Sequence, residues 1–258
     1  MLPLPASMVR AQPKSSETYR VRLAASEADV RAAQFLRFVV FNLELREGLE
    51  SAYDTCLDAD RFDSVCDHLL VENVATGEIV GTYRLQTGIT AARHHGYYSA
   101  QEFEFSPYEA LRPNLVELGR ACIHADHRNF AVLNLIWRGI AQYASAREAW
   151  YLVGCSSFSS QDPALGAAAY QSLQNHLVSP NLRTIPHPTF HCPLERSAPI
   201  SPKIPKLLAT YLLVGAKICG PPALDREFKT IDFLTLIDLR QLSPRASQRF
   251  FGTPSLGT

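Results

Sequence analysis

The sequence predicts an α/β fold in which a mixed central sheet is flanked by helices. Three observations support this prediction. Strand-like apolar runs alternate along the chain with segments whose apolar residues recur at helical spacing. Residues 115 to 155 have the pattern strand, helix, strand, and the length of a right-handed crossover that places two strands parallel. An earlier pair of strands separated by a Gly-containing turn adds an antiparallel hairpin.

The first expected elements are a helix and that hairpin. Ser26-Glu-Ala-Asp29 has the form of a capping box and opens a helix over residues 27–47, which ends near Gly48. After an acidic loop, residues 68–72 and 78–85 are expected to pair around Thr76-Gly77. This hairpin is expected to begin the sheet, and an irregular insertion separates it from the next strand.

The crossover unit comes next. Residues 115–123 predict a strand, and the following helix begins near Asn129 and carries an apolar stripe that includes Ile136 and Trp137. Residues 150–155 have the character of a buried strand.

The remaining elements complete the expected domain organisation. Asp162-Pro163 opens a helix that reaches about Leu177, residues 180–202 form a proline-punctuated connector, residues 205–217 form a helix and residues 232–239 a final strand. We expect a flexible leader (1–18), a single domain (19–240) that includes a C-terminal helix-strand extension (205–240), and a tail (241–258).

Composition excludes several classes of protein. Lys and Arg number 25 and Asp and Glu number 25, so the balanced charge argues against a nucleic-acid partner bound through a broad basic face. The apolar run 207–220 is short for a membrane span and contains Lys217. The six cysteines form no C-x-x-C pair and the amino terminus lacks a secretion-signal pattern, so we expect a cytoplasmic protein. Peripheral contact with the inner face of the membrane, through the apolar helix 205–217 and its lysines, stays open.

The turn after the strand 115–123 suggests an anion site. Unpaired N–H groups and the positive end of the helix dipole meet there, although the glycines of a dinucleotide fingerprint are absent. The turn contains a compact polar and cationic set that suits a single phosphate, namely His124, His127, Arg128 and Asn129.

Several strings resemble one family. Val116-Glu-Leu-Gly-Arg-Ala-Cys-Ile-His124, His127-Arg-Asn129 and Leu133-Asn-Leu-Ile-Trp-Arg-Gly-Ile140 are similar to the bacterial ornithine N-acyltransferases. So are Asp63-Ser-Val-Cys-Asp-His-Leu-Leu-Val71, Val153-Gly-Cys-Ser-Ser-Phe158 and Ile218-Cys-Gly-Pro-Pro-Ala-Leu-Asp225. The resemblance covers about residues 19–240. It implies a GNAT-like acyltransferase fold, related to the N-acyl amino acid synthases and acyl-homoserine-lactone synthases and often labelled haemolysin-like.

The resemblance implies a reaction and its partners. A long-chain acyl group, commonly 3-hydroxyacyl, would pass from acyl carrier protein, with acyl-CoA as the other candidate donor, to the α-amino group of an amino acid. Ornithine is the expected acceptor, and no bound cofactor or metal is expected. Gly154-Cys-Ser-Ser-Phe158 fails the Gly-x-Ser-x-Gly pattern, in agreement with direct attack on the thioester.

Glu117 is the candidate catalytic residue, because it corresponds to the glutamate of the Glu-x-x-Arg string in the lactone synthases. The alternative is a structural ion pair with Arg84 or Arg120. These arginines in turn either hold the substrate carboxylate or stabilise the acidic loop.

Further acceptor candidates are acidic. The loop carboxylates Asp60, Asp63 and Asp67 either organise a pocket for a cationic amino acid or form a solvated surface, and Arg37 is a candidate for contact with them. Asp225 and Asp232 match acidic positions of the family's tail. Arg138, with Arg128, is a candidate for docking acidic carrier protein.

Three other functions stay open at this point. They are N-acylation of glycine, lysine or another amino acid, synthesis of an acyl-homoserine-lactone signal, and a membrane-active haemolysin-like protein. Residues 44–78 contain ten acidic residues against two arginines, which suggests a negative region near a cationic acceptor.

Overall fold

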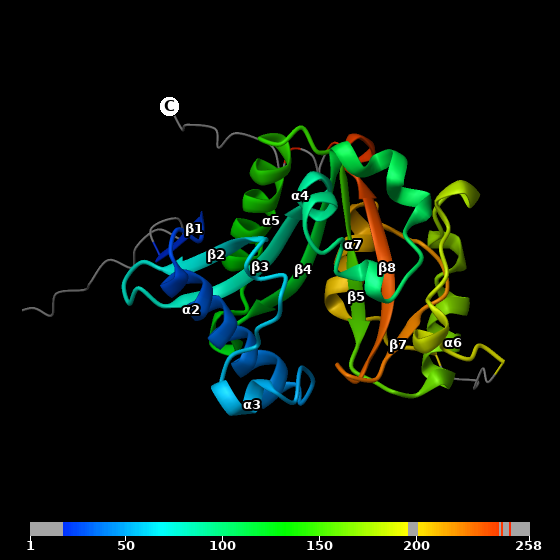
Figure 1. Cartoon of the computed structure of the whole chain (residues 1–258), viewed down its shortest axis with the longest axis horizontal. Coiled ribbons are helices and arrows are strands. Elements are labelled where there is room, and N and C mark those ends of the chain that lie inside the picture. The colour runs from blue at the N-terminus through cyan, green and yellow to red at the C-terminus, as the bar shows by residue number, and fades with distance from the viewer. Residues whose placement is uncertain (1–17, 196–200, 243, 245–247, 249–258) are drawn as a thin grey trace, which may run out of the picture.

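A computed structural model describes residues 18–195, 201–242, 244 and 248. The expected leader 1–18, except for residue 18, and most of the expected tail 241–258 lie outside these residues. The described residues form an α/β domain around one eight-stranded mixed sheet, with strand order β1-β2-β3-β4-β5-β8-β6 and with β7 paired to β8 (Figure 1). The strands are β1 (Tyr19–Leu23), β2 (Asp67–Asn73), β3 (Ile79–Thr87), β4 (Leu115–Ile123), β5 (Tyr151–Phe158), β6 (Lys217–Ile218), β7 (Ala223–Asp225) and β8 (Thr230–Asp238).

The helices flank this sheet. They are α2 (Glu27–Arg37), α3 (Ala52–Thr55), α4 (Gly88–Arg93), α5 (Phe130–Ser145), α6 (Pro163–Ser172) and α7 (Lys206–Val214), with a π-helical segment, η1 (Phe38–Glu44), directly after α2. Among the described residues, no helix combines the length and the apolar character that crossing a bilayer requires.

The antiparallel half of the sheet contains the expected hairpin. β2 pairs with β3, and β3 pairs with β4. The expectation that this hairpin begins the sheet was wrong, because β1 pairs antiparallel with β2 and forms the edge. Residues 19–23 alternate arginine with apolar residues and are too few to give a clear strand signal.

The first helix begins as predicted and ends differently. The Ser26 hydroxyl accepts a hydrogen bond from the Asp29 N–H, as in a capping box. The predicted single helix 27–47 is α-helical only to Arg37 and continues as the π-helix η1 to Glu44. The wider π turn changes the helical register beside the sheet, and it is a feature often found at functional sites.

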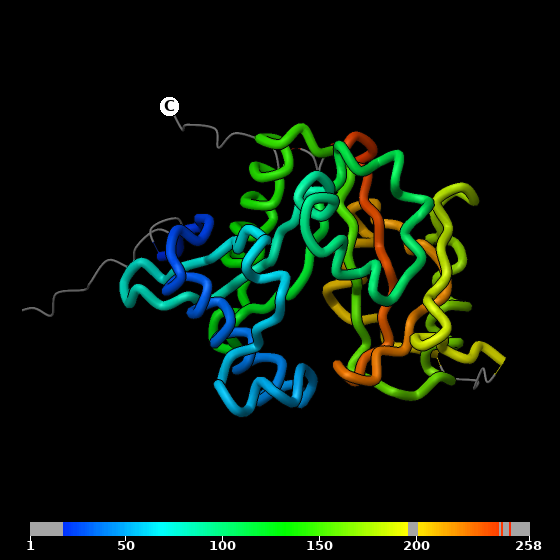
Figure 2. The backbone as a smooth tube through the Cα atoms, in the orientation of Figure 1, coloured from blue at the N-terminus to red at the C-terminus, as the bar shows by residue number. Residues whose placement is uncertain are grey.

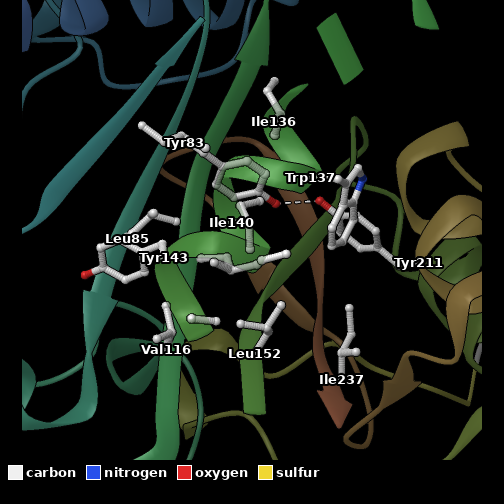
Figure 3. Close-up of a cluster of buried hydrophobic side chains, with 14 of the residues drawn as sticks. Tyr83, Leu85, Val116, Ile136, Trp137, Ile140, Tyr143, Leu152, Tyr211 and Ile237 are labelled. Carbon is white, nitrogen blue, oxygen red and sulfur yellow. Dashed lines mark hydrogen bonds between the residues drawn. The ribbon is translucent and has the colours of Figure 1, made fainter. Parts of the chain in front are cut away.

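The crossover unit formed where it was predicted. Asn129 caps α5 by accepting hydrogen bonds from the N–H groups of Ala131 and Val132. The buried stripe of α5, with Trp137 and Ile140, packs on the face of the sheet that carries Tyr83 (Figure 3). Tyr211 of α7 joins this core through a hydrogen bond between the Tyr211 and Tyr83 hydroxyls.

The two halves of the sheet meet where β4 and β5 run parallel. Pairing is limited to three registered pairs, from Leu115 with Tyr151 to Glu117 with Val153. Beyond Glu117 the two strands diverge toward their carboxyl ends (Figure 1). β5 pairs with β8 along its whole length, so the opening lies between two well-formed half-sheets.

The long insertion after β3 covers the second half of the sheet. Residues 88–114 contain α4 and two 3-10 segments, and their aromatic residues pack against side chains of β5 and β8. Figure 2 shows this segment laid over β5 and β8. The C-terminal helix is shorter than the predicted 205–217, because α7 ends at Gly215, whose φ of 107° suits glycine, and residues 217–218 form β6.

Candidate functional site

The opening between β4 and β5 contains a pocket of about 250 Å³, which we call the central pocket. β4 contributes residues 117–121, and β5 contributes residues 155–157. β3, the η1 segment, the turn at residues 98–102, the β7–β8 hairpin and Leu207 of α7 also line it. The pocket is therefore built from elements that only the tertiary fold brings together.

Glu117 lies at the point where the strands part. Its side chain is buried and lines the central pocket. Each carboxylate oxygen accepts one backbone hydrogen bond, Oε2 from Tyr98 and Oε1 from Ser99, both at 2.8 Å. Burial raises the pKa of Glu117, while these two N–H donors oppose the shift. The expected ion pair with Arg84 or Arg120 is absent from the ion pairs of the described residues.

Arg84 and Arg120 enter the same pocket from neighbouring strands. Arg120 has a φ of 53°, an unusual value for a residue other than glycine, at a bulge where the register of β3 and β4 shifts. Both guanidiniums pack on the Tyr98 ring, with Cζ 5.3 and 5.1 Å from its centre. Arg84 Nη2 and Arg120 Nε are buried without a hydrogen-bond partner.

The acidic loop holds these arginines in place. Arg84 pairs with Asp60 and Asp63, at 2.6 and 2.9 Å, and Arg120 pairs with Asp60 at 3.0 Å and with Asp58 at 3.5 Å. Arg37 joins from α2 by pairing with Asp58 and Asp63. We call these residues the arginine–aspartate cluster: Arg37, Arg84, Arg120, Asp58, Asp60 and Asp63.

Three cations balance three anions in this cluster. Burial opposes ionisation of Asp63, but Arg37 and Arg84 hold its pKa well below the usual range. Of the six side chains, the central pocket is lined by Arg84 and Arg120 only. The loop carboxylates are thus neutralised supports for the arginines, and the predicted contact of Arg37 with the loop is confirmed.

Asp67 is elsewhere. It accepts hydrogen bonds from Tyr143 and Arg147, at 2.7 and 3.0 Å, on the α5 side of the sheet, and it does not line the central pocket. The next residue, His68, is buried and donates a hydrogen bond from Nε2 to the Asp63 carbonyl. The placement of Asp67 beside Asp60 and Asp63 as an acceptor ligand was therefore wrong, because the loop ends and β2 begins at residue 67.

A second acidic group lies across the pocket. Asp225 and Asp232, both predicted, converge with Glu102, which sequence reasoning missed. One carboxylate oxygen from each lies within 4.8 Å of the others, and we call this the three-carboxylate cluster. Glu102 belongs to the irregular segment between β3 and β4, so no local periodicity could have placed it. Among the described residues, no histidine takes part in a group of converging metal-ligating atoms.

Cys155 lies between the two acidic regions. Its Sγ is 3.6 Å from Ser99 Oγ and 4.0 Å from Glu102 Oε2. Burial, with the negative charges of Glu102 and Asp232, raises the pKa of the Cys155 thiol well above its usual value. The thiol therefore stays protonated at neutral pH and is a poor nucleophile.

The turn between β4 and α5 is polar but largely self-paired. Arg128 forms a two-pronged ion pair with Glu44, at 2.5 and 2.7 Å, and the His127 ring contacts the Tyr19 hydroxyl. His124 Nδ1 accepts from the Asp126 N–H, and Asn129 caps α5. Arg138, eight residues into α5, is half-buried. The predicted set is therefore split between the turn itself and the flank of the helix.

An apolar groove of about 410 Å³ runs from this turn to the central pocket. It begins beside Arg128 and passes between α5 and α7. The groove and the central pocket share five lining residues, which are Phe41, Leu45, Tyr83, Ala121 and Leu207. The two cavities are therefore adjacent, and Leu207 of α7 lies at their boundary.

Comparisons with known proteins agree with this architecture. Residues 36–138 match the model of the acetyltransferase (GNAT) domain. The chain is 35% identical over 243 residues to an L-ornithine N(alpha)-acyltransferase from Brucella abortus, covering 87% of this chain and 86% of that protein. It is 32% identical to enzymes of the same name from Rhodobacter capsulatus, covering 88% and 93%, and Rhizobium meliloti, covering 93% and 86%.

Solved structures share the fold. The AHL synthase LasI superimposes with a TM-score of 0.53 at 14% identity, covering 93% of this chain and 98% of its own. The CoA-dependent acyl-homoserine lactone synthase BjaI gives a TM-score of 0.51 at 13% identity, with 92% of each chain covered. The GNAT-like fold predicted from the sequence is confirmed.

Proposed function

Since the chain belongs to the L-ornithine N(alpha)-acyltransferase family and is an acyltransferase, we propose that it transfers a long-chain acyl group from a carrier thioester to the α-amino group of ornithine. The observation that carries the proposal is the composition of the central pocket. It combines two guanidiniums with free N–H groups, a buried carboxylate and an adjacent apolar groove. These features match a carboxylate, an amine and an acyl chain respectively.

The acceptor carboxylate binds at Arg84 and Arg120. Arg84 Nη2 and Arg120 Nε are the buried donors without a partner, and burial makes unpaired donors costly. A carboxylate oxygen for each donor removes that cost. The ion pairs to Asp60 fix both guanidiniums before substrate arrives, so binding requires little reorganisation.

Glu117 assists loss of the amine proton. Each of its oxygens uses one lone pair on a backbone N–H and keeps another to accept from an ammonium or a water. Its burial-raised pKa favours uptake of a proton relative to an exposed glutamate. The neutral amine then attacks the thioester carbonyl directly, the tetrahedral intermediate expels the thiol, and no acyl-enzyme forms.

The donor arm follows the apolar groove. The thioester reaches the opening between β4 and β5, where β4 stays paired with β3 but no longer pairs with β5 beyond Glu117. Backbone N–H groups of β4 on this unpaired side would suit an oxyanion. The groove's outer end lies at Arg128, which suits the acidic carrier protein or the phosphate of its pantetheine arm. We take acyl carrier protein as the donor and acyl-CoA as the alternative.

The test is a reaction with defined components. Purified protein is incubated with L-ornithine and a 3-hydroxyacyl carrier protein, or with the matching acyl-CoA, and the product is identified by mass spectrometry with fragmentation. We expect Nα-acylornithine and free carrier thiol in equal amounts. Acylation of the δ-amine, or hydrolysis of the thioester without any amide product, would contradict the proposal.

A further inference from the structure

The three-carboxylate cluster joins three separate parts of the chain. Glu102 follows the turn at residues 99–101, Asp225 ends β7, and Asp232 lies on β8. Their exposed fractions are 3, 4 and 4%, and all three line the central pocket. Three buried carboxylates this close repel one another and are costly unless a positive charge or protons compensate them.

No arginine or lysine of the described residues pairs directly with this cluster. None of the ion pairs of the described residues includes Glu102, Asp225 or Asp232. Arg120 acts on Glu102 electrostatically but is paired with Asp58 and Asp60. Burial together with Asp232 and Asp225 raises the pKa of Glu102 well above its usual value, and burial with Asp225 raises that of Asp232 to about 6.

The hydrogen bonds leave one position open. Asp225 Oδ1 accepts from the N–H groups of Glu227 and Phe228, and Asp232 Oδ2 accepts from the Thr230 hydroxyl at 3.1 Å. The Asp232 carboxylate also interacts with the Ser157 hydroxyl and the Glu102 carboxyl, but its buried Oδ1 at the pocket forms no hydrogen bond of normal geometry. Gln86 also lines the pocket, and both of its amide atoms lack a partner. Buried polar atoms are nearly always satisfied, so these atoms point to a polar ligand.

We propose that the three-carboxylate cluster binds the side-chain ammonium of the acceptor, with Asp232 as its main ligand, and so selects a cationic amino acid over a neutral one. This inference rests on the proposed function and identifies the part of the site that recognises the side chain of the acceptor amino acid. An ammonium bound there favours ionisation of Glu102 and Asp225, which then add negative charge around it, and Cys155 stays a neutral neighbour.

The side-chain ammonium fits this position better than the α-amine. The α-amine must lose its proton and reach the thioester, and it is tied to the carboxylate held at Arg84 and Arg120. The side-chain amine keeps its proton, because an alkylammonium has a pKa of about 10.4. The carboxylates of the arginine–aspartate cluster are already matched by arginines, so they offer a second cation no unpaired charge.

The experiment compares two acceptors of equal chain length. Ornithine carries an ammonium group on Cδ, and norvaline has the same carbon chain with a hydrogen atom in its place, so that Cδ is a methyl group. The kcat/KM for each is measured with the same acyl thioester in the wild-type enzyme and in Asp232→Asn and Glu102→Gln. Asp67→Asn is the matched control, since it removes a carboxylate outside the pocket.

We expect the wild-type enzyme to prefer ornithine by about 100-fold, as loss of a charge-paired buried contact implies. In Asp232→Asn the ornithine value falls at least about tenfold while the norvaline value holds or rises. Glu102→Gln moves the ratio in the same direction, and Asp67→Asn leaves it unchanged.

Several results would overturn the inference. Equal loss with both acceptors in Asp232→Asn would assign the cluster to the α-amine or to folding. Equal wild-type rates with both acceptors would remove the selectivity itself. Activity that disappears with a chelator and returns with a divalent cation would make the cluster a metal site. Failure of the wild-type enzyme to acylate any amino acid would instead refute the proposed function.

Discussion

Two acidic clusters lie on opposite sides of one pocket, and they differ in what compensates them. Asp58, Asp60 and Asp63 are matched one for one by Arg37, Arg84 and Arg120. Glu102, Asp225 and Asp232 are all buried but have no arginine or lysine partner among the described residues. The ion pairs of the arginine–aspartate cluster hold its side chains in a fixed geometry. In the three-carboxylate cluster the repulsion between carboxylates stays uncompensated until a cationic substrate binds.

The largest expected effect concerns Glu117, which lies between the two clusters and pairs with neither. Glu117→Gln should lower kcat/KM by about 10²- to 10⁴-fold, as loss of a general base does. Its amide can accept only one of the two backbone N–H groups, so the unfolding free energy should also fall by about 1–3 kcal/mol. Kinetics at 25 °C and thermal unfolding measure the two effects.

The pH profile of Glu117→Gln separates the loss of catalysis from the loss of stability. If Glu117 takes the proton, the acid limb that it causes in wild-type kcat/KM should be absent from Glu117→Gln. A folded variant with a near-normal turnover number would exclude the proposed role.

Asp63→Ala should expose the structural nature of the arginine–aspartate cluster. It leaves two buried guanidiniums short of a partner, and breaking a buried pair costs about 3–5 kcal/mol. Asp67→Ala, which breaks a partly exposed pair with Arg147 and a hydrogen bond from Tyr143, should cost less, about 1–2 kcal/mol. Chemical denaturation of both variants gives the comparison, and equal losses would contradict the distinction.

Asp232→Asn should raise the free energy of unfolding, whereas Asp63→Ala should lower it. The pKa of Asp232 is raised from 3.8 to about 6 in the folded state. The free energy of unfolding therefore falls as pH rises through this range, because the folded protein holds the Asp232 proton more tightly than the unfolded chain does. The asparagine avoids that loss of stability and can still accept from Thr230, so we expect a gain of about 1–3 kcal/mol at pH 8. The gain should vanish near pH 4. Destabilisation at pH 8 would show that the charge is structural.

The selectivity for ornithine over norvaline should depend on ionisation of the Asp232 carboxyl. Several titratable groups act on or contact Asp232 or its cluster, namely Glu102, Asp225, Cys155, Tyr98 and Arg120. As pH falls through about 6, Asp232 takes up a proton and attracts the ornithine side chain less strongly. The ratio of kcat/KM for ornithine to that for norvaline should fall by up to about tenfold per pH unit below 6. A constant ratio between pH 5 and 8 would argue against Asp232 as the ligand.

The smallest effect is expected at Arg128, outside both clusters. Arg128→Glu breaks an exposed pair with Glu44, so stability should change by about 1 kcal/mol or less. If carrier protein docks there, its KM should rise severalfold, and more at low salt, while the ornithine KM stays the same. An unchanged carrier-protein KM would place docking elsewhere.

Local sequence signals predicted the elements that frame the pocket better than the pocket itself. β4 matches residues 115–123, and α5 begins after Asn129, because a continuous apolar strand and a capped amphipathic helix are strong local patterns. β1 and the short strands β6 and β7 were missed, since their pairing is decided by distant partners.

The site residues show the same division between local sequence signals and features that depend on distant parts of the chain. Glu117 was identified through motif resemblance, and Arg84 and Arg120 through their place on neighbouring predicted strands. The structure has all three at the pocket. The partners of Glu117 are backbone N–H groups from a segment without periodicity, which no side-chain pattern reveals. Glu102 was missed for the same reason, and only the folded chain shows that its carboxylate meets those of Asp225 and Asp232.

The most direct test is a crystal structure of the enzyme with bound L-ornithine and a non-reactive analogue of the acyl thioester. We predict the δ-nitrogen within about 3 Å of an Asp232 carboxylate oxygen and the α-carboxylate on Arg84 and Arg120. A δ-nitrogen placed against Asp60 or Asp63, or pointing into solvent with the three-carboxylate cluster unoccupied, would contradict the account.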